Sequence, residues 1–305
     1  MNILLTGASS FTGAWFANEL TRAGHAVSAV FTAAPESYTG LRRARMDALA
    51  GECRQVFNAP FGSDAFMELV EDGFDVLCHH GAYVANYKSD AFDYIAALSE
   101  NTRNVREVLA RFTALGGQRV VLTGSVFEAD AGAGDSPLRA FSPYGLSKGL
   151  TASVFRFWCE RFAVSLGRFV IPNPFGPYEE PRFTQYLMKT WAKRETASVK
   201  TPAYVRDNIH VSLLARRYAD FVVSDGPVAN PSGYVESQGA FAQRFAEAMR
   251  ARLGLDCALQ LEKQTDFAEP AVRINTDLAA PADPEWDEAL AWDAMGAYYR
   301  RLLDL

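Results

Sequence analysis

The chain has 305 residues, 49% of them hydrophobic and 22% charged, a balance typical of a globular protein that buries a core. Thirty lysines and arginines against 36 aspartates and glutamates give a net charge of −6, which argues against a general nucleic-acid-binding protein. The four cysteines are dispersed without a CxxC pair, which argues against a structural zinc site or a disulfide scaffold. We expect no metal site and no membrane partner, and a soluble protein in the cytoplasm.

The N-terminal segment has the pattern of a dinucleotide-binding βαβ unit. An apolar run at 2–5 enters a turn at 6–13, a helical pattern follows at 14–23, and a second apolar strand is predicted at 26–31. Gly7 allows a tight turn, Gly13 allows close packing of helix on strand, and Ser10 stands where a middle glycine is expected. An ordinary turn without a ligand is the alternative. The predicted cofactor contacts in this turn are Gly7, Ser9, Ser10, Phe11, Thr12 and Gly13.

The end of the second strand bears on the choice of cofactor. An acid there would bind the adenosine ribose and repel a 2′-phosphate, but the chain reads Phe31-Thr32-Ala33-Ala34. Arg42 and Arg43 follow, so we predict a preference for NADP(H) over NAD(H). The alternative is that these arginines only cover a helix. Thr32, Arg42 and Asn58 are assigned to the cofactor site.

The alternation of strands and helices continues toward a second group of candidate residues. We predict strands at 55–58, 74–82 and 118–122, a short helix at 64–71 and a long helix at 91–112. Gly81 and Ala82 would let the backbone pack against a flat ring. Neighbouring His79 and His80 point to opposite sides of a strand, so we expect them to be satisfied within the fold and not catalytic. Ser125 follows a strand at the edge that faces the ligand crevice, although it could simply begin a turn.

Residues 141–148 predict the start of a helix with a reactive face. Ser142 suits the N-cap and Pro143 the first helical position. Tyr144 and Lys148, four residues apart, emerge on one face, where the lysine's charge favours phenolate and lets the tyrosine exchange a proton. The spacing alone also occurs by chance in helices.

The remaining chain predicts a return to the sheet and a smaller lobe. A strand at 168–171 precedes a change in composition at 178–203, and 204–211 with a helix at 212–223 is predicted to rejoin the main domain. A helix at 237–253 and a last helix at 283–305, with Trp286 and Trp292 packed inward, complete the chain. We predict an α/β, Rossmann-type doubly wound parallel sheet over 1–177 and 204–225, with a substrate-binding lobe over 178–203 and 226–305.

These motifs, in this order, resemble the extended short-chain dehydrogenase/reductases that act on nucleotide sugars. The resemblance spreads over most of the chain and rests on the segments 6–13, 79–82, 123–125, 144–148, 168–177 and 206–211, and on Asn101, which sits where the family has a helix asparagine. It implies Ser125, Tyr144 and Lys148 as catalytic residues, with Tyr144 and Lys148 also touching the cofactor alongside Gly81, Ala82 and Asn101. It further implies Tyr83, Asn173, Arg206 and Arg273 as substrate-binding residues. For Arg206 and Arg273 the ligand would be the diphosphate, and for Arg273 a solvated surface position is the alternative.

The resemblance leaves several reactions open. It implies a cleft between sheet and lobe, a homodimer formed by the helices around 91–112 and 144–162, and a role in carbohydrate biosynthesis. Ser125 is followed by Val126-Phe127 and not by the Asp-Glu typical of the 4,6-dehydratases, so we do not expect dehydration. The missing ribose acid favours a 4-keto-sugar reductase that exchanges NADPH; a 4-epimerase that retains NAD is the alternative, and a non-catalytic NADP-binding sensor is a third. The nucleotide, the sugar and the pathway stay open.

Overall fold

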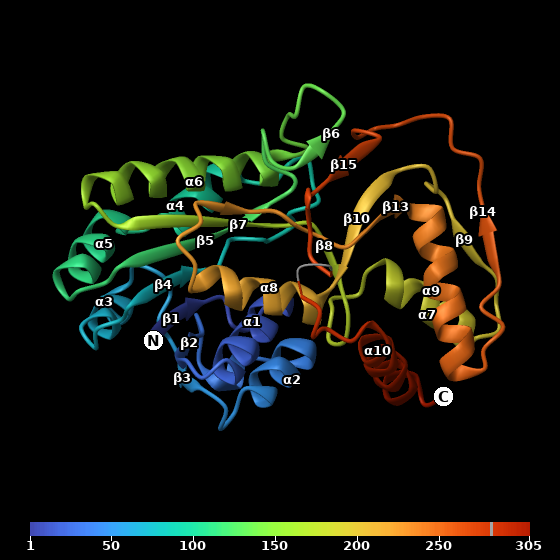
Figure 1. Ribbon diagram of the computed structural model, residues 1–305, viewed down its shortest axis with the longest axis horizontal. Helices are drawn as coiled ribbons and strands as arrows, with labels where there is room; N and C mark the ends of the chain where they lie inside the picture. Colours follow the sequence, from blue (N-terminus) through green and yellow to red (C-terminus); the bar gives the residue numbers. More distant parts are fainter. Residues whose placement is uncertain (281–282) are drawn as a thin grey trace. The chain divides into compact units, whose positions relative to one another are not determined.

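The computed structural model describes residues 1–280 and 283–305 and separates into two compact units (Figure 1). Unit 1 contains Met1–Ala131, Leu138–Ile171 and Ala215–Asn230. Unit 2 contains Gly132–Pro137, Pro172–Leu214 and Pro231–Leu305. Within the described residues, no helix combines the length and the apolar character needed to cross a membrane.

Unit 1 is built on one sheet in which every pair of neighbouring strands is parallel. In spatial order its strands are β11 (Val228–Ala229), β7 (Ser165–Ile171), β5 (Arg119–Ser125), β4 (Val76–His79), β1 (Asn2–Thr6), β2 (Ala26–Val30) and β3 (Arg54–Val56). The chain runs outward from β1 to β3 and then crosses back to β4 beside β1. The edge after β1 and β4 is therefore the switch point where doubly wound sheets bind their ligands. The predicted Rossmann-type sheet is confirmed.

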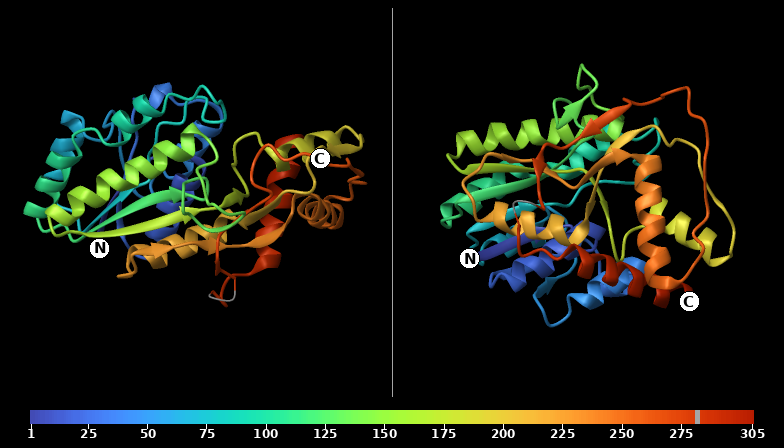
Figure 2. Two further views of the ribbon diagram at one scale, coloured as in Figure 1. Left: turned by 90° about the horizontal axis from the view of Figure 1, so that it is seen from above. Right: turned by 45° about the vertical axis from the view of Figure 1, so that its right-hand side comes forward.

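Helices cover both faces of this sheet (Figures 1 and 2). On one face α3, α5 and α6 bury Phe66, Phe112 and Phe155 against the strands. On the other, Phe16 of α1 stacks on Tyr218 of α8 with ring centroids 3.9 Å apart. The helices of this part of the chain are α1 (Phe11–Arg22), the short 3₁₀ turn η1 (Pro35–Ser37), α2 (Gly40–Ala48), α3 (Asp64–Val70), α4 (Tyr94–Asn101), α5 (Val105–Ala114), α6 (Pro143–Arg161) and α8 (Val211–Val222).

The single helix predicted at 91–112 is wrong, because two helices, α4 and α5, occupy that stretch. Between them Asn104 adopts a left-handed backbone with φ of +49° and donates from its amide to the Gly62 carbonyl at 2.8 Å. A side chain on Gly62 would meet the Arg103 carbonyl at 2.0 Å. The contact with the turn before α3 thus fixes the break, and nothing in the local sequence predicts it.

The described residues of unit 2 combine short strands with helices around a core rich in aromatic residues. Its main sheet has the order β13-β10-β15-β6, and β8 pairs with the far end of β10. Trp191, Phe245 and Trp292 are among the side chains that fill the core. The elements are β6 (Ala133–Gly134), β8 (Asn173–Phe175), α7 (Phe183–Ala192), β9 (Ala197–Val199), β10 (Val205–His210), β12 (Pro231–Ser232), β13 (Tyr234–Ser237), α9 (Gln238–Leu253), β14 (Leu259–Leu261), β15 (Val272–Ile274), β16 (Asp277–Leu278) and α10 (Glu288–Leu303).

The bounds of the two units differ from the domain division predicted from the sequence. Strand β10 pairs with β8, β13 and β15 and so belongs to unit 2, whereas the prediction placed this stretch in the main domain. From Ala215 on, α8 belongs to unit 1. The local sequence of a strand does not say which sheet it joins, because membership depends on the distant strands with which it pairs.

Candidate active site

The turn after β1 and the turn after β4 touch at their glycines. Gly7 has φ of +76°, and a side chain on it would lie 2.7 Å from the backbone nitrogen of Gly81. The hydroxyl of Thr6 accepts the Gly81 N–H at 2.9 Å and ties the two turns together. Glycine is required at position 7 both for the left-handed backbone and for this close approach.

Ser10 uses its side chain inside the turn. The hydroxyl donates to the Gly7 carbonyl at 2.8 Å and accepts the Gly13 N–H at 3.1 Å, which makes Ser10 the N-cap of α1. It also lies 3.0 Å from Nε2 of His80. The serine that replaces the expected middle glycine therefore faces inward, and the positive end of the α1 dipole remains directed at the switch point.

His79, the last residue of β4, and His80, which follows the strand, point to opposite faces of the sheet, as predicted. His79 lies 3.0 Å from the Thr6 hydroxyl and 3.0 Å from the Asn101 carbonyl, and its ring stacks on Phe155. His80 contacts Ser10 and Thr12 through Nε2 and the Thr123 hydroxyl through Nδ1, each at 3.0 Å. Burial, aided by the charge of Lys148, lowers the pKa of each histidine to about 3, so both rings are neutral near pH 7.

Asn101, the last residue of α4, connects three elements. Its side-chain oxygen accepts the Tyr83 N–H at 2.8 Å, and its amide donates to Thr151 of α6 at 3.4 Å. With the His79 contact to its carbonyl, Asn101 fixes the loop after β4 relative to α6. Tyr83 lies in that loop with its ring against Phe92.

The first turn of α6 packs directly on the chain that follows Ser125. Ser142 caps the helix by accepting the Gly145 N–H at 3.3 Å, and Pro143 is the first helical residue, as predicted. A side chain on Gly145 would lie 2.1 Å from the Phe127 carbonyl. Phe127 in turn donates its N–H to the Ser125 hydroxyl at 3.2 Å. Phe127 therefore contacts both Ser125 and the first turn of α6.

Tyr144 and Lys148 occupy successive turns of this helix. The Tyr144 ring is half-buried against Tyr87 and Phe92, with centroids 5.3 and 5.9 Å away. Lys148 is only 5% exposed. Burial lowers the pKa of Lys148, a carboxylate at Glu128 raises it, and Arg168 lowers it again.

The adenosine end of the predicted cofactor site is more open. Thr32 and Asn58 are exposed at the ends of their strands, and the Asn58 N–H donates to the Ala33 carbonyl at 3.4 Å. Arg42 is exposed, and Arg43 pairs with Asp47 at 2.8 Å, the surface arrangement considered above as the alternative.

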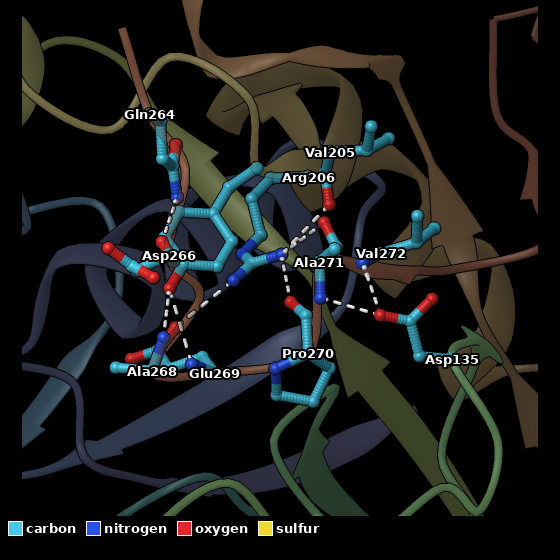
Figure 3. A network of polar contacts seen from close by, with 11 residues as sticks. Asp135, Val205, Arg206, Gln264, Asp266, Ala268, Glu269, Pro270, Ala271 and Val272 are labelled. Atoms are coloured by element: carbon cyan, nitrogen blue, oxygen red, sulfur yellow. Dashed lines mark hydrogen bonds and ion pairs between the residues drawn. The ribbon is translucent and has the colours of Figure 1, made fainter.

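The predicted substrate residues of unit 2 lie on β8, β10 and β15. Asn173 donates to the Asn208 side-chain oxygen at 2.5 Å. Arg206 stacks over the Tyr204 ring, with the guanidinium carbon 4.5 Å from its centroid. Its Nη1 donates to the carbonyls of Val205, Pro270 and Ala271, and its Nη2 pairs with Glu269 at 3.1 Å (Figure 3).

Arg273 is 1% exposed, so a solvated surface position is excluded. It is the register partner of Arg206 in the parallel pair of β10 and β15, and Asp135 accepts the N–H groups of the preceding Ala271 and Val272.

With this geometry established, comparison with known proteins identifies the family. A family model described as the NAD dependent epimerase/dehydratase family matches residues 3–219, more than half of the chain. The chain belongs to this family. The resemblance to enzymes of the extended short-chain dehydrogenase/reductase type is thereby confirmed. No significant match was found among curated proteins.

Solved structures of this epimerase/dehydratase type share the fold. UDP-glucuronic acid 4-epimerase from Bacillus cereus, solved with UDP-glucuronic acid and NAD, is 16% identical with a TM-score of 0.76, over 99% of this chain and 100% of that one. UDP-glucose 4-epimerase from Thermotoga maritima, solved with UDP-glucose, is 17% identical with a TM-score of 0.76 over the same shares. dTDP-glucose 4,6-dehydratase from Streptomyces venezuelae, solved with NAD, is 18% identical with a TM-score of 0.72, over 99% and 97%.

Three charged residues at the candidate site were missed by the sequence interpretation. Arg45 of α2 is buried, with Nη1 3.3 Å from the Ser9 carbonyl and its guanidinium over the Phe11 ring. Helical spacing does not distinguish it from Arg42, because Arg42 lies one turn before the buried Met46 just as Arg45 lies one turn before the buried Leu49. Glu128 and Arg168 form an ion pair beside Ser125, and no local pattern predicts that pair.

Proposed function

We propose that the protein transfers hydride between a nicotinamide cofactor and a carbon of a nucleotide-linked sugar, with reduction of a 4-keto sugar as the leading reaction. The observation that supports this most is the packing of the Ser125 turn on the first turn of α6 through Phe127 and Gly145. That packing holds a hydroxyl, a phenol and a buried ammonium in one unit, which is the set that proton transfer at a sugar oxygen requires.

Each of the three catalytic candidates has a role that its surroundings support. The Ser125 hydroxyl accepts the Phe127 N–H, so its own proton remains available for a hydrogen bond to the sugar oxygen. Tyr144 would hold the proton that this oxygen gains on reduction or loses on oxidation. Lys148, charged and largely out of solvent, favours the phenolate form of Tyr144 and would hold the nicotinamide ribose. When bound, the nicotinamide supplies or accepts the hydride.

The turns after β1 and β4 fit a dinucleotide. Gly7 leaves no room for a side chain where the turns meet, a side chain on Gly81 would lie 3.1 Å from the Thr6 hydroxyl, and Ser10 turns its side chain inward. A pyrophosphate could then approach the backbone at the N-terminus of α1. Gly7 to Gly13 would contact it, with Thr32, Arg42 and Asn58 toward the adenosine and Gly81, Ala82 and Asn101 toward the nicotinamide.

The comparisons do not support the predicted preference for NADP(H). The family is described as NAD dependent, and the B. cereus and S. venezuelae enzymes were solved with NAD. We therefore propose NAD(H) as the cofactor to test first. The absence of an acid in Phe31–Ala34 remains a reason to titrate NADP(H) beside it.

Unit 2 would bind the nucleotide end of the substrate. Arg206 and Arg273 are register partners on adjacent strands, so both side chains leave the sheet on the same face, where two guanidinium groups suit a diphosphate. Asn173 would bind the sugar, and Tyr83 is a further candidate from the loop after β4. Binding at Arg206 would require displacement of Glu269.

A 4-epimerase is the second candidate, favoured by the two solved 4-epimerases that share the fold. An epimerase keeps its NAD through the reaction, whereas a reductase must exchange it. The nucleotide released on denaturing freshly purified protein therefore separates the two: stoichiometric NAD favours the epimerase, and an empty site that binds NADH or NADPH reversibly favours the reductase. The homodimer, the cytoplasmic location and a role in carbohydrate biosynthesis stay predictions.

Substitution Tyr144→Phe tests the catalytic assignment. We expect loss of most turnover, on the order of a hundredfold or more for a removed acid/base group, with unchanged affinity for the cofactor. Tyr87→Phe, which removes the hydroxyl of the aromatic neighbour of Tyr144, is the matched control and should retain turnover. Full activity in Tyr144→Phe would remove the proton-transfer role, and a sensor protein would be indifferent to the change.

A further inference from the structure

A fully buried carboxylate lies three residues beyond Ser125. Glu128 is 0% exposed, and its backbone N–H and one of its carboxylate oxygens both contact Ser125. Its Oε1 accepts the Ser125 N–H at 2.6 Å, and its own N–H donates to the Ser125 carbonyl at 3.0 Å. The backbone of Ser125 is thus held on both sides by one residue.

The second oxygen of this carboxylate carries an ion pair. Nη2 of Arg168, from β7, donates to Oε2 of Glu128 at 2.5 Å. Arg168 is the register partner of Leu122 in the neighbouring strand β5. A side chain on Gly124 would lie 3.1 Å from both Glu128 Oε1 and Arg168 Nε, so a small residue before Ser125 gives the pair its room.

The two charges of this ion pair have opposite effects on the pKa of Lys148. Glu128 raises the pKa of Lys148, whereas Arg168 and burial lower it. The charge of Lys148 also lowers the pKa of His79 and His80, which are both neutral near pH 7, and Tyr144 lies one turn earlier on α6. Replacing a buried ion pair by apolar residues is often neutral or stabilising, so stability alone is a weak reason to keep Glu128 and Arg168 there.

We propose that Glu128 is a positioning residue of the reaction, which fixes the backbone of Ser125 and, balanced by Arg168, holds Lys148 in its charged form. Glu128 touches neither substrate nor cofactor in this role; it acts through the two residues that do. The inference rests on the proposed function, in which protonated Lys148 holds the ribose of the nicotinamide.

The test is the pH dependence of NADH affinity, measured by fluorescence titration between pH 6 and pH 10, roughly the span over which a perturbed lysine titrates. Affinity should fall at alkaline pH as Lys148 loses its proton. Glu128→Gln keeps an oxygen for the Ser125 N–H but removes the negative charge, so the alkaline limb should move to lower pH. A shift of one pH unit corresponds to about a tenfold weaker Kd on that limb.

The double variant Glu128→Gln/Arg168→Met separates charge from structure. It removes one negative and one positive charge near Lys148, so the limb should return toward the wild-type position. If Glu128 had a purely structural role, the double variant would bind NADH at alkaline pH no better than Glu128→Gln does. That result would overturn the proposal. If Glu128→Gln does not fold, Arg168→Met alone tests the proposal. The alkaline fall in its NADH affinity should move to higher pH, and any other result contradicts the inference.

Glu71→Gln is the matched control. Glu71 pairs with Arg111 at 3.0 Å on the exposed surface of the same unit and should leave the pH dependence unchanged. A wild-type protein that binds no nicotinamide nucleotide defeats the proposed function and this inference with it. Binding that has the same pH dependence in wild type and Glu128→Gln defeats the role of Glu128 alone.

Discussion

Each unit of the molecule contains an arginine–glutamate pair at its candidate functional residues, and the two pairs are built differently. In unit 1 the carboxylate of Glu128 is fully buried and shared between Arg168 and a backbone N–H. In unit 2 the Glu269 side chain is 54% exposed, and it meets Arg206 through one nitrogen while three carbonyls hold the other (Figure 3).

The difference indicates what each pair can do. A buried carboxylate cannot exchange its partner for water without a large cost in desolvation, so the charges beside Ser125 and Lys148 are fixed. A half-exposed carboxylate loses little when it turns to solvent, and an arginine can then take a phosphate oxygen in its place. We therefore expect the pair in unit 1 to preorganise the reacting groups and the pair in unit 2 to compete with a ligand.

The largest expected effect is on stability and comes from Glu128→Ala. Removing this side chain leaves the Ser125 N–H without its acceptor and Arg168 without its counter-ion, so the free energy of unfolding should fall by about 3–5 kcal/mol. Glu269→Ala should cost less than about 1 kcal/mol. Urea unfolding of both variants measures the contrast, and equal losses would show that the two pairs do not differ as their burial indicates.

Another buried acid sharpens the comparison, because its hydrogen bonds come from neutral donors. Glu179 of unit 2 accepts the Gly176 N–H at 3.0 Å and the Thr184 hydroxyl. Burial raises the pKa of Glu179 to about 7, although these hydrogen bonds and Arg182 oppose the shift. The folded state then holds a proton that the unfolded chain releases near pH 4.5, so stability should decrease as the pH rises from about 4.5 to 7.

Glu179→Gln should remove this pH dependence, because the amide keeps the shape of the protonated acid without its charge. We expect the variant to gain roughly 2–3 kcal/mol over wild type between pH 5 and pH 8 in urea unfolding. Glu195→Gln, an exposed acid of the same unit, is the control. A constant difference between Glu179→Gln and wild type across this range would mean that Glu179 is ionised in the folded protein throughout.

Local patterns predicted the parts of unit 1 that depend on local chemistry. The glycine turn after β1, the Ser142 cap and the opposite directions of His79 and His80 follow from spacing within a few residues of chain. Which strands β10 pairs with is not determined by its local sequence, so its membership of the second sheet could not be predicted. The break before Asn104 depends on the distant Gly62 and gave no local signal.

The charged residues of the candidate site show the same limit. Tyr144 and Lys148 could be proposed because a helix brings positions four apart together. Glu128 and Arg168 belong to different segments, and only the pairing of β5 with β7 brings them together. Arg45 and Arg42 are three residues apart on one helix, yet Arg45 is buried against the turn after β1 and Arg42 is exposed. The assigned roles of the site residues stay predictions.

The smallest expected effect tests whether Glu269 competes with a ligand for Arg206. Removing it in Glu269→Ala should tighten the binding of UDP or dTDP by a few-fold, since the pair contributes less than about 1 kcal/mol. Calorimetric titration measures this, and the gain should shrink at high salt because the group is half-exposed.

Asp266→Ala is the control for this comparison. Asp266 lies three residues earlier in the same segment, is exposed, and accepts the Thr265 hydroxyl at 3.2 Å, so its removal changes the net charge of the segment by the same amount. Tighter binding in Glu269→Ala but not in Asp266→Ala would identify the direct pair as the cause. An equal gain in affinity in both variants would mean that the effect comes from the long-range charge of the segment. No gain in either would mean that a nucleoside diphosphate does not bind to Arg206.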